Sequence, residues 1–301
     1  MIDFTNAKWI NEGELYTKEE RNVFKALTKA ILSSEDEILL NGNYPDHFIF
    51  NILYDVKYSN PLTFGLRDAY VDSNYGGLTR VFFRYYDEYN QWKTEIRDRV
   101  KDLYEKMDIG GCKTDLEKEI VVNEWLCKNC VYDKTIEKHL RHSVLGILLY
   151  SHGVCSSFAL CVSLLLMCFG VKCYPILGKM TKPEYKQKFE SIDVSDFIQN
   201  IKGNPRDYDI FRRDDKRQNP SKISTMTTDK IDYEDTMNHA WNYVYIEKQE
   251  RHLDVTFNNG YYNDRRSSKT QYSCFNMIKA EFDDRKIFFG PEIDEKREYY
   301  M

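Results

Sequence analysis

The feature that most constrains this chain is an apolar run, GVCSSFALCVSLLLMCFG, at residues 153–170. Residues 156–169 are apolar on nearly every side, which is typical of a helix that its neighbours enclose. The apolar stretch around residues 158–169 is shorter than the ~20 residues that span a bilayer, so it predicts a buried core helix. Gly170 is placed to cap the C-terminus of this helix. The following VKCYPILG is typical of a strand.

Composition predicts one or two globular domains without nucleic-acid or membrane partners. The 301 residues are 42% hydrophobic and 15% aromatic, which is enough to bury a substantial core. The net charge is -5 and basic residues alternate with acids, so no footprint for nucleic acid or an anionic membrane is present. The N-terminus has no basic segment followed by an apolar one, so we expect no signal peptide and a cytoplasmic protein.

Residues 1–110 are expected to form an N-terminal α+β region of unknown role. Thr17 and Glu20 form a capping-box pattern at the start of its first helix. Periodicity and turn residues predict, in order, a helix at 18–32, a helix that ends near Pro61, two strands joined at Gly76-Gly77, and a helix at 89–107. Gly110-Gly111 breaks the last helix and marks the expected domain boundary.

Residues 111–301 are expected to form the second domain. Thr114 and Glu117 repeat the capping-box pattern, and the helix that follows ends near Asn129. A charged insertion with three prolines occupies about residues 179–238, and its length predicts a lid or a mobile loop. Strand character returns in HAWNYVYIEKQERHLDVTF, two runs around a charged turn, and the tail predicts one more strand or helix.

Cys155 stands at the first position of the predicted buried helix. Unpaired backbone N–H groups and the positive end of the helix dipole stabilise a thiolate there, so this thiol can be activated as a nucleophile. A small buried hydrophobe is the alternative for Cys155 taken alone, because free cysteines are commonly buried. That interpretation is the better one for the cysteines further along the helix and strand, which are Cys161, Cys168 and Cys173.

His239 and Asp254 are the candidate partners of this thiol. A thiolate nucleophile needs an imidazole that protonates the leaving group, and the imidazole needs an orienting acceptor. His239 opens one predicted strand, and Asp254 lies on the next. An even-numbered loop within residues 247–251 places both side chains on one face of the sheet, whereas an odd loop separates them. The other histidines lie beside charged or helical segments or too near Cys155 in sequence: His47, His139, His142 and His152.

The remaining cysteines raise the question of a metal site. Eight cysteines in a chain without an export signal predict thiols rather than disulfides. The spacing Cys127-x-x-Cys130 suggests zinc, but a structural zinc site needs four ligands and the only other cysteine nearby is Cys112. We therefore expect no metal and no cofactor. A metal-dependent domain built on these three cysteines is the alternative.

Three sequence blocks resemble the signature blocks of the transglutaminase-like superfamily of cysteine enzymes. They are GVCSSFALCVSLLL followed by Gly170-Val171, then HAWNYV, then LDVTF. The upstream segment VVNEWLCKNCVYD also resembles the helix and Tyr-Asp segment that precede the nucleophile in that family. Together these blocks cover about residues 116–257, interrupted by the charged insertion.

The resemblance implies a fold and a role for each site residue. It implies Cys155 as nucleophile, His239 as general base and acid, and Asp254 as the orienting acceptor. It implies an α+β, papain-like arrangement in which the nucleophile helix packs on an antiparallel sheet that carries the other two residues. Trp241 matches an aromatic wall of the family's site and is expected to contact substrate. A tryptophan in the core or on the sheet face is the equal alternative.

The expected function is acyl transfer through a thioester intermediate. The Cys155 thiolate attacks an amide or ester carbonyl of a peptide or protein substrate. Hydrolysis of a peptide or amide bond, by a cysteine protease or amidase, is the first expectation, and transamidation of protein glutamine is the second. A catalytically inactive binding module on the same fold is the alternative from a different class. The sequence sets no oligomeric state.

Overall fold

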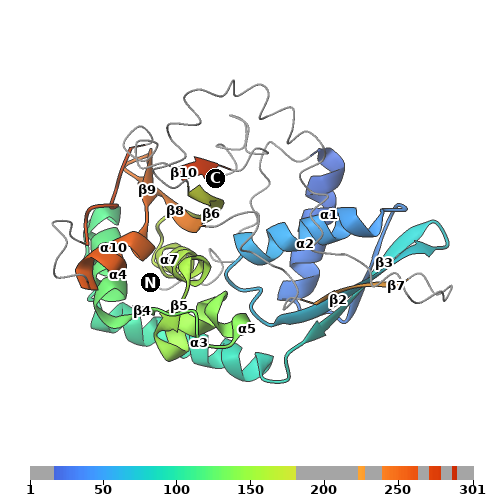
Figure 1. Cartoon of the computed structure of the whole chain (residues 1–301), viewed down its shortest axis with the longest axis horizontal. Helices are drawn as coiled ribbons and strands as arrows, with labels where there is room; N and C mark the ends of the chain where they lie inside the picture. The colour runs from blue at the N-terminus through green and yellow to red at the C-terminus, as the bar shows by residue number, and fades with distance from the viewer. Residues whose placement is uncertain (1–16, 181–222, 228–238, 264–270, 279–286, 290–301) are drawn as a thin grey trace.

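The computed structural model of the chain describes residues 17–180, 223–227, 239–263, 271–278 and 287–289. Its elements are α1 (Lys18–Leu32), β1 (Glu37–Leu40), α2 (Asp46–Ser59), β2 (Leu66–Tyr75), β3 (Leu78–Tyr85), α3 (Tyr89–Lys106), α4 (Asp115–Asn129), β4 (Val131–Tyr132), α5 (Lys138–Arg141), α6 (Val144–Tyr150), β5 (His152–Gly153), α7 (Cys155–Cys168), β6 (Cys173–Met180), β7 (Ile223–Thr227), β8 (His239–Ile246), β9 (Gln249–Leu253), α10 (Val255–Asn263) and β10 (Ile287–Phe289). Among these residues the strands form two antiparallel sheets, β1-β3-β2-β7 and β10-β6-β8-β9, and a short parallel pair β4-β5. Figure 1 shows the two larger sheets towards opposite ends of the molecule, with α7 beside the second.

The N-terminal elements follow from local sequence signals. Thr17 Oγ1 accepts the Glu20 N–H at 3.1 Å, and the Glu20 carboxylate accepts the Thr17 N–H at 2.8 Å. This capping box confirms the predicted start of α1. Gly76 and Gly77 both have positive φ, +59° and +86°, as the tight turn between β2 and β3 requires. The predicted helix–helix–hairpin order is therefore confirmed, although the short strand β1 was not predicted.

One strand of the N-terminal sheet comes from the charged insertion. β7 pairs antiparallel with β2, from Ile223 opposite Asp72 to Thr227 opposite Asp68. The sequence analysis predicted a lid or mobile loop over about 179–238 and missed this strand. Residues 181–222 and 228–238 of that segment lie outside the described residues, so its predicted character remains a prediction.

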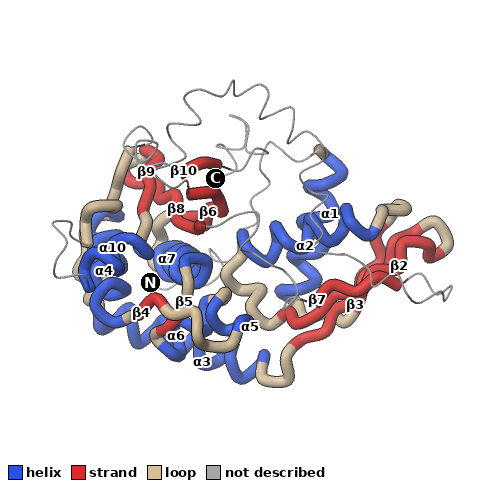
Figure 2. Tube along the Cα trace, viewed as in Figure 1, coloured by secondary structure: helices blue, strands red, loops and turns tan. Residues whose placement is uncertain are grey.

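The helix α7 lies at the centre of the C-terminal half of the described residues. Every residue of α7 is buried, and α4, α6, α10 and the strands β6 and β8 pack around it (Figure 2). It ends at Cys168, and Gly170 follows two residues later with φ of +85°. There Gly170 N–H donates to Met167 O at 3.1 Å and Val171 N–H donates to Leu166 O at 2.8 Å, a Schellman cap. The predicted core helix and its glycine cap are confirmed.

No helix within the described ranges has both the length and the apolar character needed to cross a membrane.

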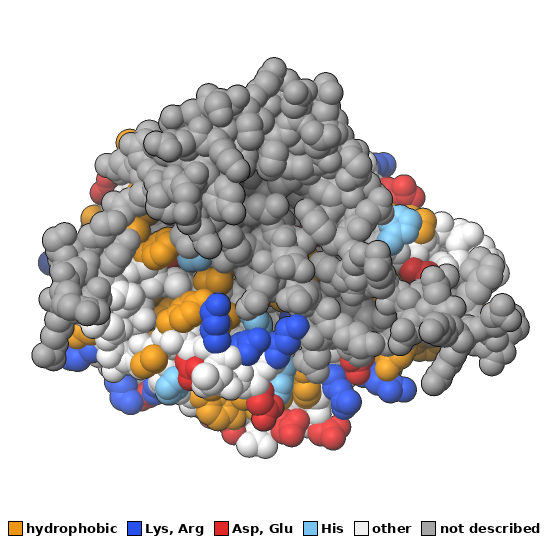
Figure 3. Space-filling model, viewed as in Figure 1, with side chains coloured by type: hydrophobic (Ala, Val, Ile, Leu, Met, Phe, Trp, Pro, Cys, Tyr) orange, Lys and Arg blue, Asp and Glu red, His pale blue; other side chains and the backbone are white. Residues whose placement is uncertain are grey.

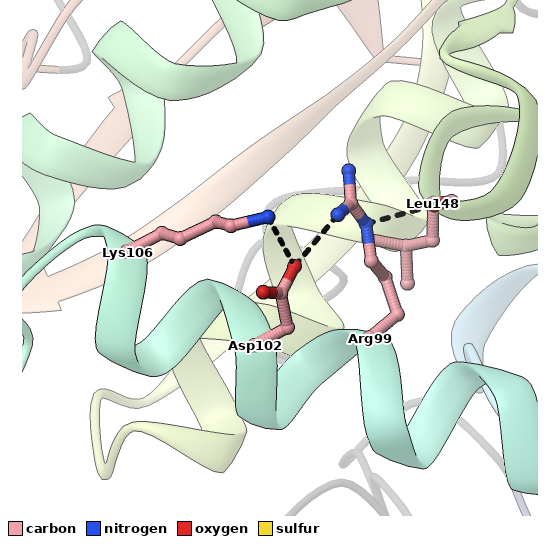
Figure 4. A network of polar contacts seen from close by, with 4 residues as sticks. All are labelled: Arg99, Asp102, Lys106 and Leu148. Carbon is pink, nitrogen blue, oxygen red and sulfur yellow. Dashed lines mark hydrogen bonds and ion pairs between the residues drawn. The ribbon is translucent and has the colours of Figure 1, made fainter.

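The long helix α3 is connected to α4 and α6 through Arg99. Arg99 Nε donates to Leu148 O of α6 at 3.2 Å, and its Nη1 pairs with Asp102 at 2.8 Å (Figure 4). Lys106 Nζ reaches the same carboxylate at 2.9 Å, and its hydrogen bond is the largest cause of a lowered pKa at Asp102. The Arg99 guanidinium also lies 5.4 Å from the ring centroid of Trp125 in α4. Arg99 therefore contacts both α4 and α6 from α3.

Hydrophobic contacts join the elements before the glycine pair at residues 110–111 to those after it. The apolar face of α3 is buried in the same cluster as α7 and α4; its members are Trp92, Ile96, Val100 and Leu103. A second cluster joins α1, α2 and the N-terminal sheet, and it includes Cys155, Ala159 and Ala240. The boundary predicted between residues 1–110 and 111–301 stays a prediction, with α3 in contact with the second region.

The segment after Asp254 is a helix rather than the end of a strand. The sequence analysis assigned LDVTF to the second strand of the hairpin, and this is wrong from Asp254 onward, which includes the predicted place of Asp254 on that strand. β9 ends at Leu253, and the Asp254 carboxylate accepts the Phe257 N–H at 3.1 Å, as a helix N-cap does. The tail contributes β10, which pairs with β6, so the strand option predicted for it is the correct one.

Candidate active site

Cys155 is the first residue of α7, as predicted. The preceding residue, Val154, provides no side-chain cap, so the helix start relies on backbone contacts. Val154 N–H donates to Arg141 O at 3.2 Å, and Ser157 Oγ donates to Val154 O at 2.7 Å. The first-turn N–H groups of a helix have no intrahelical partner, and together with the helix dipole they favour an anion at this position. The local structure therefore suits a thiolate at Cys155.

A tight hairpin brings His239 and Asp254 together. The loop between β8 and β9 is the pair Glu247 and Lys248, with φ of +53° and +65°. A two-residue loop is even, so the condition that the sequence analysis set for a shared face is met. The His239 Nε2 to Asp254 Oδ2 distance is 2.6 Å.

Asp254 is fully buried and uses both carboxylate oxygens. Oδ2 contacts His239, while Oδ1 accepts the Phe257 N–H at 3.1 Å and so caps α10. Its backbone is fixed as well, because Asp254 N–H donates to Cys274 O at 2.9 Å and Asp254 O accepts from Asn258 N–H at 3.1 Å. One side chain therefore starts a helix and orients an imidazole.

The imidazole of His239 lies between the carboxylate and the thiol. Because Nε2 faces Asp254, the other ring nitrogen, Nδ1, is left for the hydrogen bond with Cys155. Burial acts to lower the pKa of His239, but the charge and hydrogen bond of Asp254 and the hydrogen bond of Cys155 outweigh it and raise the pKa to about 10. The ring is therefore an imidazolium at neutral pH, the form that pairs with a thiolate.

Aromatic rings enclose this imidazole. Trp241 stacks on His239 with ring centroids 5.9 Å apart, and Phe257 lies at 4.9 Å. The indole N–H of Trp241 donates to His252 Nδ1 at 3.2 Å, and Trp241 is only 1% exposed. These contacts correspond to the sheet-face alternative for Trp241. Its expected contact with substrate stays a prediction.

The N-terminal region contributes to the surroundings of the thiol. Cys155 is 5% exposed and belongs to the hydrophobic cluster of α1, α2 and the first sheet. Tyr58 of α2 is buried near it, and burial followed by the charge of Cys155 raises the pKa of Tyr58. The sequence analysis gave residues 1–110 no role, and the structure brings α2 to one side of Cys155.

A second histidine lies beside the start of α7. His142 Nδ1 is 2.9 Å from Ser156 Oγ, the residue next to Cys155. Burial and four nearby cations lower the pKa of His142 to about 3, so its ring is neutral. The cations are Arg141, Lys57, Lys138 and Lys134. Figure 3 shows basic side chains gathered near the centre of this face, in the region of α5. Sequence reasoning set His142 aside, because its charged neighbours gave no sign of this contact.

The cysteines of the zinc alternative show no ligand cluster. Cys127 and Cys130 are buried in the hydrophobic cluster of α7, and burial raises the pKa of each thiol to about 12. Within the described ranges, no group of three or more histidine, cysteine or acidic side chains is placed to hold a metal ion. All eight cysteines are thiols rather than disulfides.

Comparison with known proteins places this chain in a family. The family model of the transglutaminase-like superfamily matches residues 101–257, just over half of the chain. A solved structure described as the crystal structure of a TGase aligns at 11% identity with a TM-score of 0.31, over 66% of this chain and 46% of that one. This chain thus spans less than half the length of that protein, and no curated protein matches it. The chain belongs to the transglutaminase-like superfamily, with the α+β, papain-like fold expected from its sequence.

Proposed function

We propose that the protein transfers acyl groups through a thioester on Cys155, with His239 and Asp254 completing a catalytic triad. The observation that carries this proposal is the 2.6 Å contact between His239 and Asp254. The same imidazole is hydrogen-bonded to Cys155 at the start of α7. The raised pKa of His239, about 10, supplies the imidazolium that a thiolate nucleophile requires.

The chemistry follows from these positions. The Cys155 thiolate adds to the carbonyl carbon of an amide, and the C=O electron pair moves to oxygen. Backbone N–H groups at the start of α7 are the donors available to this oxyanion. His239 then gives its proton to the departing amine nitrogen as the C–N bond breaks, which leaves a thioester on Cys155 and a neutral imidazole.

The acceptor decides the product. Neutral His239 removes a proton from water, which attacks the thioester and releases a carboxylic acid and Cys155. We propose this hydrolysis of a peptide or amide bond as the main reaction. An amine acceptor in place of water gives transamidation.

One observation favours a second candidate, a binding module without turnover. Cys155 is 5% exposed, and α2 lies on one side of it. A thiol covered in this way can belong to an intact triad that substrate does not reach.

Acylation with an activated ester tests the proposal. Incubation with p-nitrophenyl acetate is expected to release one equivalent of nitrophenol in a burst and to add one acetyl group to the Cys155 peptide in mass spectra. Adding a primary amine then shows which acceptor is used, because transamidation yields an amide whereas hydrolysis yields acetate alone.

Cys155→Ala and Cys161→Ala are the matched controls. Cys161 lies on the same helix and is fully buried, so its loss is expected to leave the burst unchanged, whereas Cys155→Ala is expected to abolish it. A burst that survives Cys155→Ala contradicts the proposal, and absence of any burst in the wild type favours the binding module.

A further inference from the structure

Asn242 connects the strand of the histidine to the helix of the cysteine. It lies on β8, three residues after His239, and is 1% exposed. Its Nδ2 donates to Ala159 O at 2.8 Å and to Ser163 Oγ at 2.8 Å, both on α7, and to Tyr174 O of β6 at 3.4 Å. The sequence analysis assigned this asparagine no role.

The orientation of the carboxamide is fixed by its partners. Ala159 O and Tyr174 O can only accept, so the NH₂ group must face them and the amide cannot be reversed. Asn242 Oδ1 then has no hydrogen-bond partner among the described residues. An unpaired buried acceptor is destabilising, so an apolar residue of similar size would be less costly here. A directional role for the NH₂ group accounts for a polar residue at this position.

The contacts of Asn242 bear on the position of Cys155. Residues 155, 159 and 163 are spaced by four along α7, so they share one face of the helix. Ala159 is one turn from Cys155, about 6 Å along the helix axis at the usual rise per residue. Most other contacts of α7 are hydrophobic and non-directional, apart from the His142–Ser156 hydrogen bond at its first turn. The hydrogen bonds at Ala159 and Ser163 are directional and join α7 to the strand that carries His239.

We propose that Asn242 is a positioning residue that sets the axial position of α7 against β8 and so holds Cys155 within hydrogen-bond reach of His239. This inference rests on the proposed function. A shift of about 1 Å is enough to break a hydrogen bond or to cost ~100-fold in a reaction that depends on geometry. Removal of the carboxamide therefore weakens the pairing of the thiol with the imidazolium without touching either residue.

Alkylation of Cys155 measures this pairing directly. We expect Asn242→Leu and Asn242→Ala to lower the iodoacetamide labelling rate of Cys155 at about pH 6 by ~10-fold or more, because the thiol loses its imidazolium partner. The pH profile of labelling is expected to move towards that of Cys112, the one thiol of the eight that is not buried. Asn242→Leu is expected to melt at or above the temperature of Asn242→Ala, since it fills the space without an unpaired oxygen.

Asn259 offers a matched control. It is also buried, and its Nδ2 donates to three carbonyls at the end of α4: Leu126 O at 3.5 Å, Cys127 O at 3.2 Å and Cys130 O at 2.8 Å. Asn259→Leu is expected to change the melting temperature but to keep the labelling profile of the wild type.

Each outcome decides between the two proposals. Loss of low-pH labelling in folded Asn242 variants, with the profile kept in Asn259→Leu, supports the positioning role. Folded Asn242 variants that label like the wild type overturn it and leave the proposed function standing. Failure of both Asn242 variants to fold shows a purely structural residue and also overturns it. A wild type that shows no selective labelling of Cys155 overturns the proposed function, and the positioning role falls with it.

Discussion

Asp254→Ala is expected to lower the free energy of unfolding by about 3–5 kcal/mol at neutral pH, because it removes one partner of a buried ion pair. His239 is 4% exposed and Asp254 is fully buried, so the imidazolium left behind is poorly solvated. Loss of the N-cap of α10 adds to this cost. Urea denaturation of the wild type and the variant measures the difference.

Asp254→Asn separates the two roles of the carboxylate. Asparagine keeps an oxygen that can cap α10 but removes the charge that faces His239. Because the pKa of His239 is raised from 6.5 to about 10, the stability from its pairing is fully present below about pH 6.5 and is lost as pH rises to about 10. We expect this decline in the wild type and a flat profile over the same window in Asp254→Asn. Equal slopes in both proteins contradict the pairing.

Asp133→Ala is the control for a lost local cap. Its carboxylate accepts the Thr135 N–H at 2.6 Å in a similar way, but it is only half-buried and contacts no catalytic candidate. We expect this change to cost much less stability than Asp254→Ala, because the lost contact is local and solvent-screened.

Glu119→Gln is expected to remove a large pH dependence of stability. Glu119 of α4 is fully buried, and neither carboxylate oxygen has a hydrogen-bond partner among the described residues. Burial raises its pKa from 4.5 to about 8, against a smaller opposing effect of the Arg251 charge. The folded state therefore keeps a proton that the unfolded state releases, so wild-type stability falls as pH rises from about 4.5 to about 8. The total loss is of the order of 4 kcal/mol.

The buried amide that Glu119→Gln introduces is itself unpaired and changes the stability by an amount that does not depend on pH. The relevant measurement is therefore the difference between wild type and Glu119→Gln in how the free energy of unfolding changes with pH. Below about pH 4.5 the profiles of wild type and Glu119→Gln are expected to run parallel, and above it the wild type falls away. Glu105→Gln, a change at an exposed glutamate of α3, is expected to leave the profile unchanged. Parallel profiles up to pH 8 in wild type and Glu119→Gln show that Glu119 ionises normally.

The elements that the sequence predicted are those with strong local signals. The capping boxes at Thr17 and Thr114, the turn glycines at 76–77 and the all-apolar α7 each act within a few residues, so they could be located without knowledge of the fold. The strand β7 depends on pairing with β2, about 150 residues earlier in the chain. No local sequence pattern indicates a pairing over such a distance along the chain.

The buried face of α4 shows a second limit of prediction from local sequence patterns. The apolar residues Ile120, Val121 and Trp125 of this helix are only half-buried. The most buried residues include Glu119 and Asn123 instead. Asn123 is accommodated because it accepts from the amide of Asn258 in α10 at 3.0 Å, a partner that exists only in the folded chain.

The residues of the candidate site also divide into those that the sequence predicted and those that it did not. Cys155, His239 and Asp254 were predicted as a group from residue type, the helix start and the family resemblance, whereas the hairpin geometry stayed conditional on the loop length. Asn242 was not, because its importance comes from acceptors on α7 that no sequence pattern places beside it.

Iodoacetamide labelling from about pH 5 to about pH 9, with peptide mapping, tests the central claim most directly in the wild type and in His239→Ala. The account predicts that Cys155 labels selectively and down to low pH in the wild type. In His239→Ala its rate at pH 6 should fall by roughly 100-fold, towards that of a thiol with little thiolate at that pH. Slow labelling that is uniform across the accessible thiols, or no labelling of Cys155, would contradict the thiolate–imidazolium pair and support a binding module with a covered thiol.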